Sequence, residues 1–117
     1  MVRAVQEALE QAESHPEVRA LVLTGAGSSF CAGAELDTLE QGAIGNVDQV
    51  KSVQDGFLRV LRSPLRTIAA VNGPAVGAGF NLALACDIRL AARTAKFNTR
   101  FLEGLARIWA NIARASR

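Results

Sequence analysis

The 117-residue sequence is poor in the residues that build metal and nucleophile sites, with one histidine and two cysteines. Cys31 and Cys86 lie far apart and form no Cys-x-x-Cys pair, and His15 precedes a proline at an expected surface turn. Such a small number of histidines and cysteines argues against a metal site and against a paired cysteine–histidine nucleophile. We expect two free thiols in a reducing compartment, which indicates a cytoplasmic location.

Long apolar runs and strong charge of one sign are also missing. No apolar stretch reaches the length of a transmembrane helix, and the first residues form a charged amphipathic segment rather than a signal peptide. The formal net charge is +2 and no basic stripe stands out, so neither nucleic acid nor a membrane is an expected partner. Half of the residues are apolar, which is typical of one globular domain with a modest core.

Two glycine-rich stretches lack the residues of nucleotide-binding loops. Gly25-x-Gly27 follows an expected strand, but the third glycine of the dinucleotide fingerprint is missing. The loop at residues 73–79 has no Gly-Lys-Ser/Thr sequence, so it is not a phosphate-binding P-loop. Neither stretch predicts a nucleotide site.

Hydrophobic periodicity predicts alternating helices and strands, and hence an α/β fold class. The expected helices span residues 2–14, 47–61, 77–86 and 101–112, and the expected strands span residues 18–24, 66–71, 87–91 and 95–98. The unbroken apolar run at residues 20–23 predicts a strand buried on both faces. Such strands are typical of a parallel sheet with helical crossovers.

The strongest constellation is a pair of bends rich in glycine and alanine, at residues 31–36 and 76–81. Each bend follows an expected strand. If these strands are neighbours, both bends open at the same edge of the sheet, where α/β proteins usually bind ligands. Two backbone N–H groups could then converge on one carbonyl oxygen and stabilise an enolate or a tetrahedral oxyanion. Tight packing of helix on strand is the alternative interpretation of these small residues.

Two signatures at these bends resemble those of the crotonase, or enoyl-CoA hydratase/isomerase, family. One is Val-Leu-Thr-Gly-Ala-Gly at residues 22–27 with Phe-Cys-Ala-Gly-Ala-Glu-Leu at residues 30–36. The other lies at residues 70–79 and 82–87. The resemblance implies a crotonase-like ββα-superhelix and a coenzyme A thioester as substrate, with no separately bound cofactor. It also implies a homo-oligomer, either a trimer or a dimer of trimers.

The same match implies a set of site residues. The donors of the oxyanion hole are the backbone N–H groups of Ala34 and Ala78. Backbone donation explains why small side chains suffice at these two positions. The match implies no metal, and the residues it places around the substrate are Ala32, Gly33, Glu35, Leu36, Val76, Gly77, Gly79 and Asn81.

Two positions depart from the pattern of the family's hydratases. Asn81 and Phe101 stand where those enzymes carry their two catalytic glutamates. An amide does not titrate and a phenyl ring has no proton to give, so two-carboxylate water addition is in doubt. Double-bond isomerisation, which can work with one base, is slightly favoured. Glu35, Asp37 and Glu103 are near enough in sequence to consider as that base, although each is more simply a helix-start or solvated charge.

The match covers the central part of a crotonase domain, so we expect one partial domain over residues 1–117. The family's N-terminal hairpin and C-terminal helices are missing from it, and residues 104–117 read as an atypical basic helical tail. Uncovered sheet edges and apolar faces would favour an oligomer or low stability of a lone chain. The alternative to an enzyme is a truncated, non-catalytic paralogue that acts as a binding or assembly module.

Overall fold

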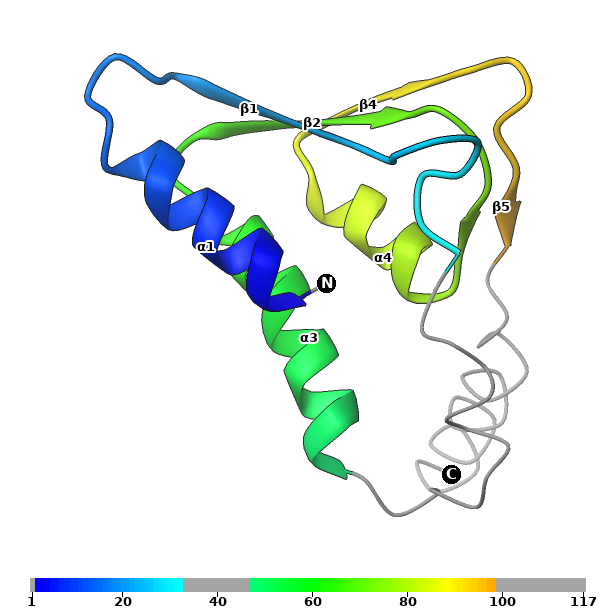
Figure 1. The fold of residues 1–117 in the computed structure, drawn as a ribbon, viewed down its shortest axis with the longest axis horizontal. Helices are drawn as coiled ribbons and strands as arrows, with labels where there is room; N and C mark the ends of the chain where they lie inside the picture. Colours follow the sequence, from blue (N-terminus) through cyan, green and yellow to red (C-terminus); the bar gives the residue numbers. More distant parts are fainter. Residues whose placement is uncertain (1, 33–46, 99–117) are drawn as a thin grey trace, which may run out of the picture.

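The computed structural model describes residues 2–32 and 47–98, which form a three-stranded sheet, a small second sheet and three helices (Figure 1). The expected helix at residues 101–112, the expected tail at residues 104–117 and the part of the first bend beyond residue 32 lie outside these ranges. The expected domain is described here only over the two ranges.

Three parallel strands form the main sheet. β1 (Ala20–Thr24), β2 (Arg66–Val71) and β4 (Ile88–Ala91) lie in the order β1-β2-β4. Val22 pairs with Ile68, and Ile68 pairs with Ile88, so one row of side chains crosses the sheet. The predicted parallel sheet is confirmed, and the predicted strands agree with the observed ones to within two residues.

A second, smaller parallel sheet continues from the main one. β3 (Ala75–Val76) pairs with β5 (Phe97–Asn98), and Cys31 forms a parallel bridge with Ala75. The chain passes three times from the main sheet to the small one: from β1 to Cys31, from β2 to β3, and from β4 to β5. After β3 it enters helix α4 (Ala78–Ala85), which completes a ββα unit. The sequence did not predict β3, because two residues between a proline and a glycine carry no alternating pattern.

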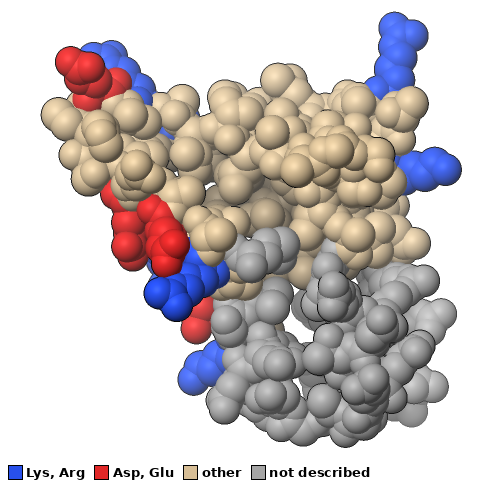
Figure 2. Space-filling view, in the orientation of Figure 1, with Lys and Arg blue, Asp and Glu red and all other residues tan. Residues whose placement is uncertain are grey.

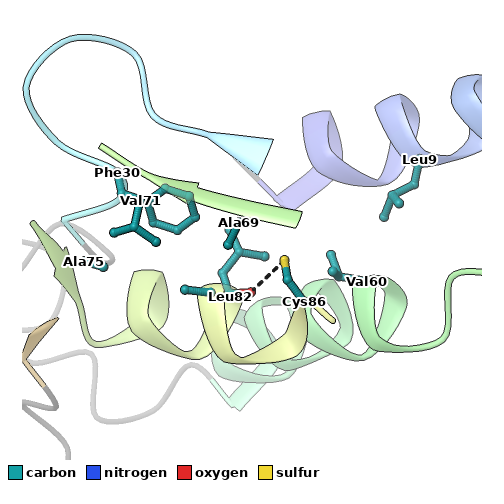
Figure 3. Close-up of a cluster of buried hydrophobic side chains, with 9 residues drawn as sticks. Leu9, Phe30, Val60, Ala69, Val71, Ala75, Leu82 and Cys86 are labelled. Carbon is teal, nitrogen blue, oxygen red and sulfur yellow. Dashed lines mark hydrogen bonds between the residues drawn. The ribbon is translucent and has the colours of Figure 1, made fainter. Parts of the chain in front are cut away.

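Three helices cover one face of the main sheet. α1 (Val2–Glu13), α3 (Val47–Leu61) and α4 lie together below the sheet in Figure 1. α1 and α3 agree with the predicted helices, and α3 ends just before Ser63-Pro64. The core forms between these helices and the strands, as Figure 3 shows; its buried members are Leu9, Phe30, Val60, Ala69, Val71, Ala75, Leu82, Ala83 and Cys86.

No helix from the described ranges covers the opposite face of the main sheet (Figure 1). The prediction that residues 20–23 are buried on both faces is therefore wrong: exposed and half-buried side chains alternate along β1, and Val22 is 60% exposed. Ile88 and Leu90 of β4 are also exposed, in register with Ile68 and Ala70 of β2. We call the apolar surface formed by these five residues the open sheet face.

A partly buried ion pair joins the last turns of α1 and α3. Arg59 donates from Nη1 to Glu13 Oε1 over 2.9 Å and from Nη2 to Glu13 Oε2, and Ser63 Oγ also donates to Oε1. The hydrogen bond from Arg59 lowers the pKa of the Glu13 carboxyl and raises that of the guanidinium. Figure 2 shows the charged side chains at the margins of this view, around a broad uncharged middle.

Candidate functional site

The two predicted bends lie against each other. β1 and β2 are parallel neighbours, so the segments that follow them leave the same edge of the main sheet. The N–H groups of Phe30 and Cys31 donate to the carbonyl oxygen of Pro74 over 3.1 and 3.2 Å, and Val76 N–H donates to the carbonyl oxygen of Cys31 over 2.9 Å. The predicted meeting of the bends is confirmed at Cys31, and the first described range ends at the next residue, the exposed Ala32.

Gly79 allows the first turn of α4 to touch the first bend. A Cβ atom at this position would lie 2.1 Å from the carbonyl oxygen of Cys31. Such a separation is far inside van der Waals contact, so a glycine is required here. The glycine brings the amino end of α4 directly beside the segment that leads into residues 33–36.

Ala78 opens α4 with a buried backbone. Ala78 is 6% exposed, and its N–H has no hydrogen-bond acceptor among the residues that the structure describes. The preceding residue, Gly77, supplies no side-chain cap. The first N–H groups of a helix have no partner within the helix and carry a partial positive charge. Ala78 therefore presents a fixed, unpaired donor next to the joined bends.

The remaining described residues of the predicted site surround Ala78. Val76 is half-buried in β3, and Gly77 is buried and donates its N–H to the carbonyl oxygen of Asn98 over 2.8 Å. Asn81 lies three residues after Ala78 and exposes its side chain, while its N–H donates to the carbonyl oxygen of Gly77. Helix α4 is buried on only part of its surface, since Asn81 and Leu84 are both exposed. The described residues of the predicted site carry neutral groups only.

Four of the ten predicted site residues fall on positions that the structure does not describe. Gly33, Ala34, Glu35 and Leu36 lie in the gap between the two described ranges, and Phe101 lies beyond the second. The alternative carboxylates Asp37 and Glu103 also lie outside them. The structure thus describes Ala78, one of the two predicted donors. On the way to the other, Ala34, it describes the chain as far as Ala32, two residues earlier.

The side chain of Asn72 joins the loops that lead into the two bends, a role that the sequence did not predict. Its Nδ2 donates to the carbonyl oxygens of Gly27 and Ser29 over 3.0 and 3.4 Å. Its Oδ1 accepts from Gly25 N–H over 3.0 Å and lies 3.4 Å from Thr24 Oγ1, whose hydroxyl donates over 2.9 Å to the carbonyl oxygen of Ala70. No signal near Asn72 in the sequence could have found this role, because the groups that it bonds lie 43 to 48 residues away.

The cysteine and aspartate that end the second signature are structural. Burial raises the pKa of the Cys86 thiol, which keeps it protonated, and its Sγ contacts the carbonyl oxygen of Leu82 at 3.5 Å. Asp87 Oδ2 accepts from the N–H and the hydroxyl of Thr67, at 2.9 and 3.3 Å. Cys31 and Cys86 form no disulfide within the described residues. The described residues hold no cluster of histidine, cysteine and carboxylate side chains suited to a metal.

One open hollow lies away from the joined bends. It has a volume of about 270 Å³, and neither Ala78 nor Cys31 lines it. Most of its walls are aliphatic, and it continues the open sheet face rather than the candidate site. The residues that line it are Thr24, Ala70, Val71, Asn72, Leu90, Ala91 and Ala92.

Comparison with known proteins identifies the family. The enoyl-CoA hydratase/isomerase family model matches residues 1–106. The chain is 48% identical over 103 residues to a probable enoyl-CoA hydratase, EchA14, of Mycobacterium tuberculosis, an alignment that covers 86% of this chain and 40% of that protein. It is 41% identical over 100 residues to the 1,2-epoxyphenylacetyl-CoA isomerase of Escherichia coli, covering 81% of this chain and 38% of the relative.

Solved structures agree with the sequence relatives. An enoyl-CoA hydratase from Polaromonas sp. JS666 matches with a TM-score of 0.78 and 38% identity, over 86% of this chain and 41% of that one. The crotonase-like fold is therefore confirmed, and the chain spans about 40% of the length of the relatives that it matches. Within the two described ranges, no helix is long and apolar enough to cross a membrane.

The matched family model, the close relatives and the shared fold agree with the two signatures at the joined bends. This chain belongs to the enoyl-CoA hydratase/isomerase family.

Proposed function

We propose that the chain binds an acyl-CoA thioester and stabilises the enolate of its carbonyl with the backbone N–H groups of Ala34 and Ala78. One observation carries the proposal: the unpaired, buried N–H of Ala78 lies beside the bend that leads to Ala34. A donor that is already fixed toward a developing oxyanion needs no reorganisation during the reaction. Removing one such donor typically costs about 10²–10³ in rate.

The substrate class rests on family membership. The two relatives described above are named for an enoyl-CoA and for 1,2-epoxyphenylacetyl-CoA, both of them coenzyme A thioesters. In this proposal the thioester is the substrate, and no separate cofactor or metal takes part. Ala32, Val76, Gly77 and Gly79 would line the acyl group with backbone and small side chains, together with the undescribed Gly33, Glu35 and Leu36.

Isomerisation is favoured over hydration as the reaction. The side chain at Asn81 is an exposed amide one turn after Ala78, so it can donate a hydrogen bond but cannot move a proton. Water addition by two carboxylates lacks this member, whereas moving a double bond along an enolate needs one base that first removes and then returns a proton. The names of the relatives do not decide this preference, because EchA14 is named a hydratase and the Escherichia coli isomerase is named for an epoxide.

Turnover and binding assays on the 117-residue chain test the proposal. Crotonyl-CoA reports hydration and a 3-enoyl-CoA reports isomerisation, while calorimetry with the same thioesters reports binding. We expect binding of both and turnover of the 3-enoyl-CoA. Binding without turnover would replace the enzyme by a non-catalytic acyl-CoA binding module, and absence of binding would refute the oxyanion-hole proposal itself.

We further propose that the chain associates with copies of itself through its uncovered apolar surface. The open sheet face exposes Val22 on β1 and Ile88 and Leu90 on β4, on either side of β2, with Val22 60% and Leu90 63% exposed. Contiguous apolar surface of this kind is typical of interaction sites. The trimeric assembly implied by the family resemblance is the expected form.

A further inference from the structure

We propose that Gly77 and strand β5 are positioning elements that fix the direction of the Ala78 N–H group. The inference rests on the proposed function, because it concerns the aim of one of its donors. β5 runs beside β3, at the point where the chain turns into α4 (Figure 1). From there it contacts the residue directly before Ala78 and a residue shortly after it.

The peptide group between Gly77 and Ala78 is oriented by the hydrogen bond of its own carbonyl oxygen. This oxygen accepts from the N–H of Asn81 over 3.1 Å, which is the first bond of the helix. In a planar trans peptide the C=O and N–H groups point in opposite directions. Because the carbonyl points into the helix, the Ala78 N–H points back out of its amino end.

Gly77 turns the backbone from the strand ladder into the helix. Its φ is 55° and its ψ is −114°, a region that glycine enters readily and that residues with a Cβ atom rarely adopt. Its own N–H stays in the ladder and donates to the carbonyl oxygen of Asn98 in β5 over 2.8 Å. Within the described residues, the turn at Gly77 thus leaves the Ala78 N–H outside both the ladder and the helix.

An aromatic contact ties the first turn of α4 to the same strand. The ring centroids of Phe80 and Phe97 lie 5.4 Å apart, and the ring planes are inclined by 53°. Such a tilted arrangement is favourable for two aromatic rings. Phe80 follows Ala78 by two residues and Gly77 precedes it by one, so β5 holds the chain on both sides of the donor. A donor that is held in this way needs no reorganisation when an oxyanion forms.

Acetoacetyl-CoA is a suitable probe, because its acidic α-proton lets the enolate be measured by ultraviolet absorbance without turnover. With the wild-type chain, we expect binding to increase the enolate fraction at a given pH. Gly77→Ala sets a Cβ atom on a backbone that disfavours it, so the peptide group that carries the Ala78 N–H should rotate. We expect the gain in enolate to fall about tenfold or more, while the Kd for a saturated acyl-CoA changes less than about threefold. An unchanged gain in folded Gly77→Ala would overturn the positioning role.

Gly27→Ala is the matched control for backbone strain. Gly27 also has a positive φ, of 75°, and a Cβ atom there would meet nothing within 4 Å. It lies in the loop after β1, outside the predicted site. This variant should lose stability in urea unfolding and keep the wild-type gain in enolate. An equal loss of enolate in both variants would show that strain alone is the cause and would refute a specific role for Gly77.

Phe97→Ala decides the matter if Gly77→Ala does not fold. The Phe97 side chain is 45% exposed, so its removal should leave the fold intact. We expect the gain in enolate to fall about threefold or more with little change in the Kd for a saturated acyl-CoA. Leu61→Ala, at an exposed position on α3, should alter neither quantity. An unchanged gain in Phe97→Ala, or an equal loss in Kd, would overturn the positioning role of β5.

The wild-type measurement separates this inference from the proposed function. If the wild-type chain binds the probe without raising its enolate fraction, the proposed function fails, and the positioning role fails with it. If the wild type raises the enolate fraction and Gly77→Ala and Phe97→Ala raise it equally, only the positioning role fails.

Discussion

The carbonyl oxygen of Cys31 lies where a side chain on Gly79 would have to be, 2.1 Å from the position of its Cβ atom. This contact presses the first turn of α4 against the bend that follows β1. The atom in the way belongs to the backbone of Cys31, so no side-chain rotation can relieve the clash. The approach of the two bends thus depends on the absence of one methyl group.

Gly79→Ala should therefore destabilise the fold by about 1–3 kcal/mol and weaken acyl-CoA binding, because the two bends must separate. Urea unfolding and calorimetry measure the two effects. Leu84→Ala is the matched control, since it changes an exposed position on the same helix. A Gly79→Ala chain with wild-type stability and affinity would show that the contact has no role.

Stability should fall with acid partly through Glu13. The hydrogen bond from Arg59 holds the pKa of this carboxyl below its ordinary value of 4.5. The unfolded chain then takes up the proton first, so the stabilisation is present above pH 4.5 and is lost as the pH falls through the lowered folded-state pKa. In urea unfolding, Glu13→Gln should be less stable than wild type at neutral pH, and the difference should close in acid. A pH-independent difference would contradict this account.

Leu9 should contribute strongly to the packing of α1 on the rest of the core. It is fully buried at 0% exposure, so Leu9→Ala should cost about 2–5 kcal/mol of unfolding free energy. Leu61→Ala on α3 removes the same atoms from a side chain that is 63% exposed, and it should cost far less. Equal losses in chemical denaturation would show that the core is not arranged as in Figure 3.

Asp87 should matter for folding rather than for chemistry. Its carboxylate accepts a hydrogen bond from the N–H of Thr67, a residue that is 2% exposed. Asp87→Ala should cost about 1–3 kcal/mol, because it leaves a buried N–H unpaired. Asp55→Ala, at an exposed position on α3, should change stability little. If the enolate fraction of bound acetoacetyl-CoA fell while stability held, Asp87 would belong to the active site instead.

The sequence predicted the order and type of the larger elements, because periodic patterns in α1, α3 and β2 reflect the face that each buries. The parallel pairing of β1 with β2 also followed from apolar runs joined by helices. Two features of the fold did not follow. β3 is too short to carry a pattern, and its strand geometry depends on pairing with β5. The exposure of Val22 depends on what covers the second face of the sheet, which local sequence does not encode.

In the candidate site, too, some features could be predicted from the sequence and others could not. Small residues at Ala78 and Gly79 predicted a close backbone approach, and the structure places Gly79 against Cys31. The bridging role of Asn72 required knowledge of which loops lie opposite each other. A side chain that bonds four groups 43 to 48 residues away gives no signal in its own neighbourhood.

Ala78→Pro tests the central claim most directly. Proline is well tolerated at the first position of a helix, where its missing N–H has no helical partner to lose. The substitution therefore removes the proposed donor and leaves the helix in place, which circular dichroism can check. We predict that the wild-type chain raises the enolate fraction of bound acetoacetyl-CoA. In folded Ala78→Pro, we expect the stabilisation of the enolate to be about 10²–10³-fold weaker. A folded Ala78→Pro chain that raises the enolate fraction as much as wild type would contradict the oxyanion hole.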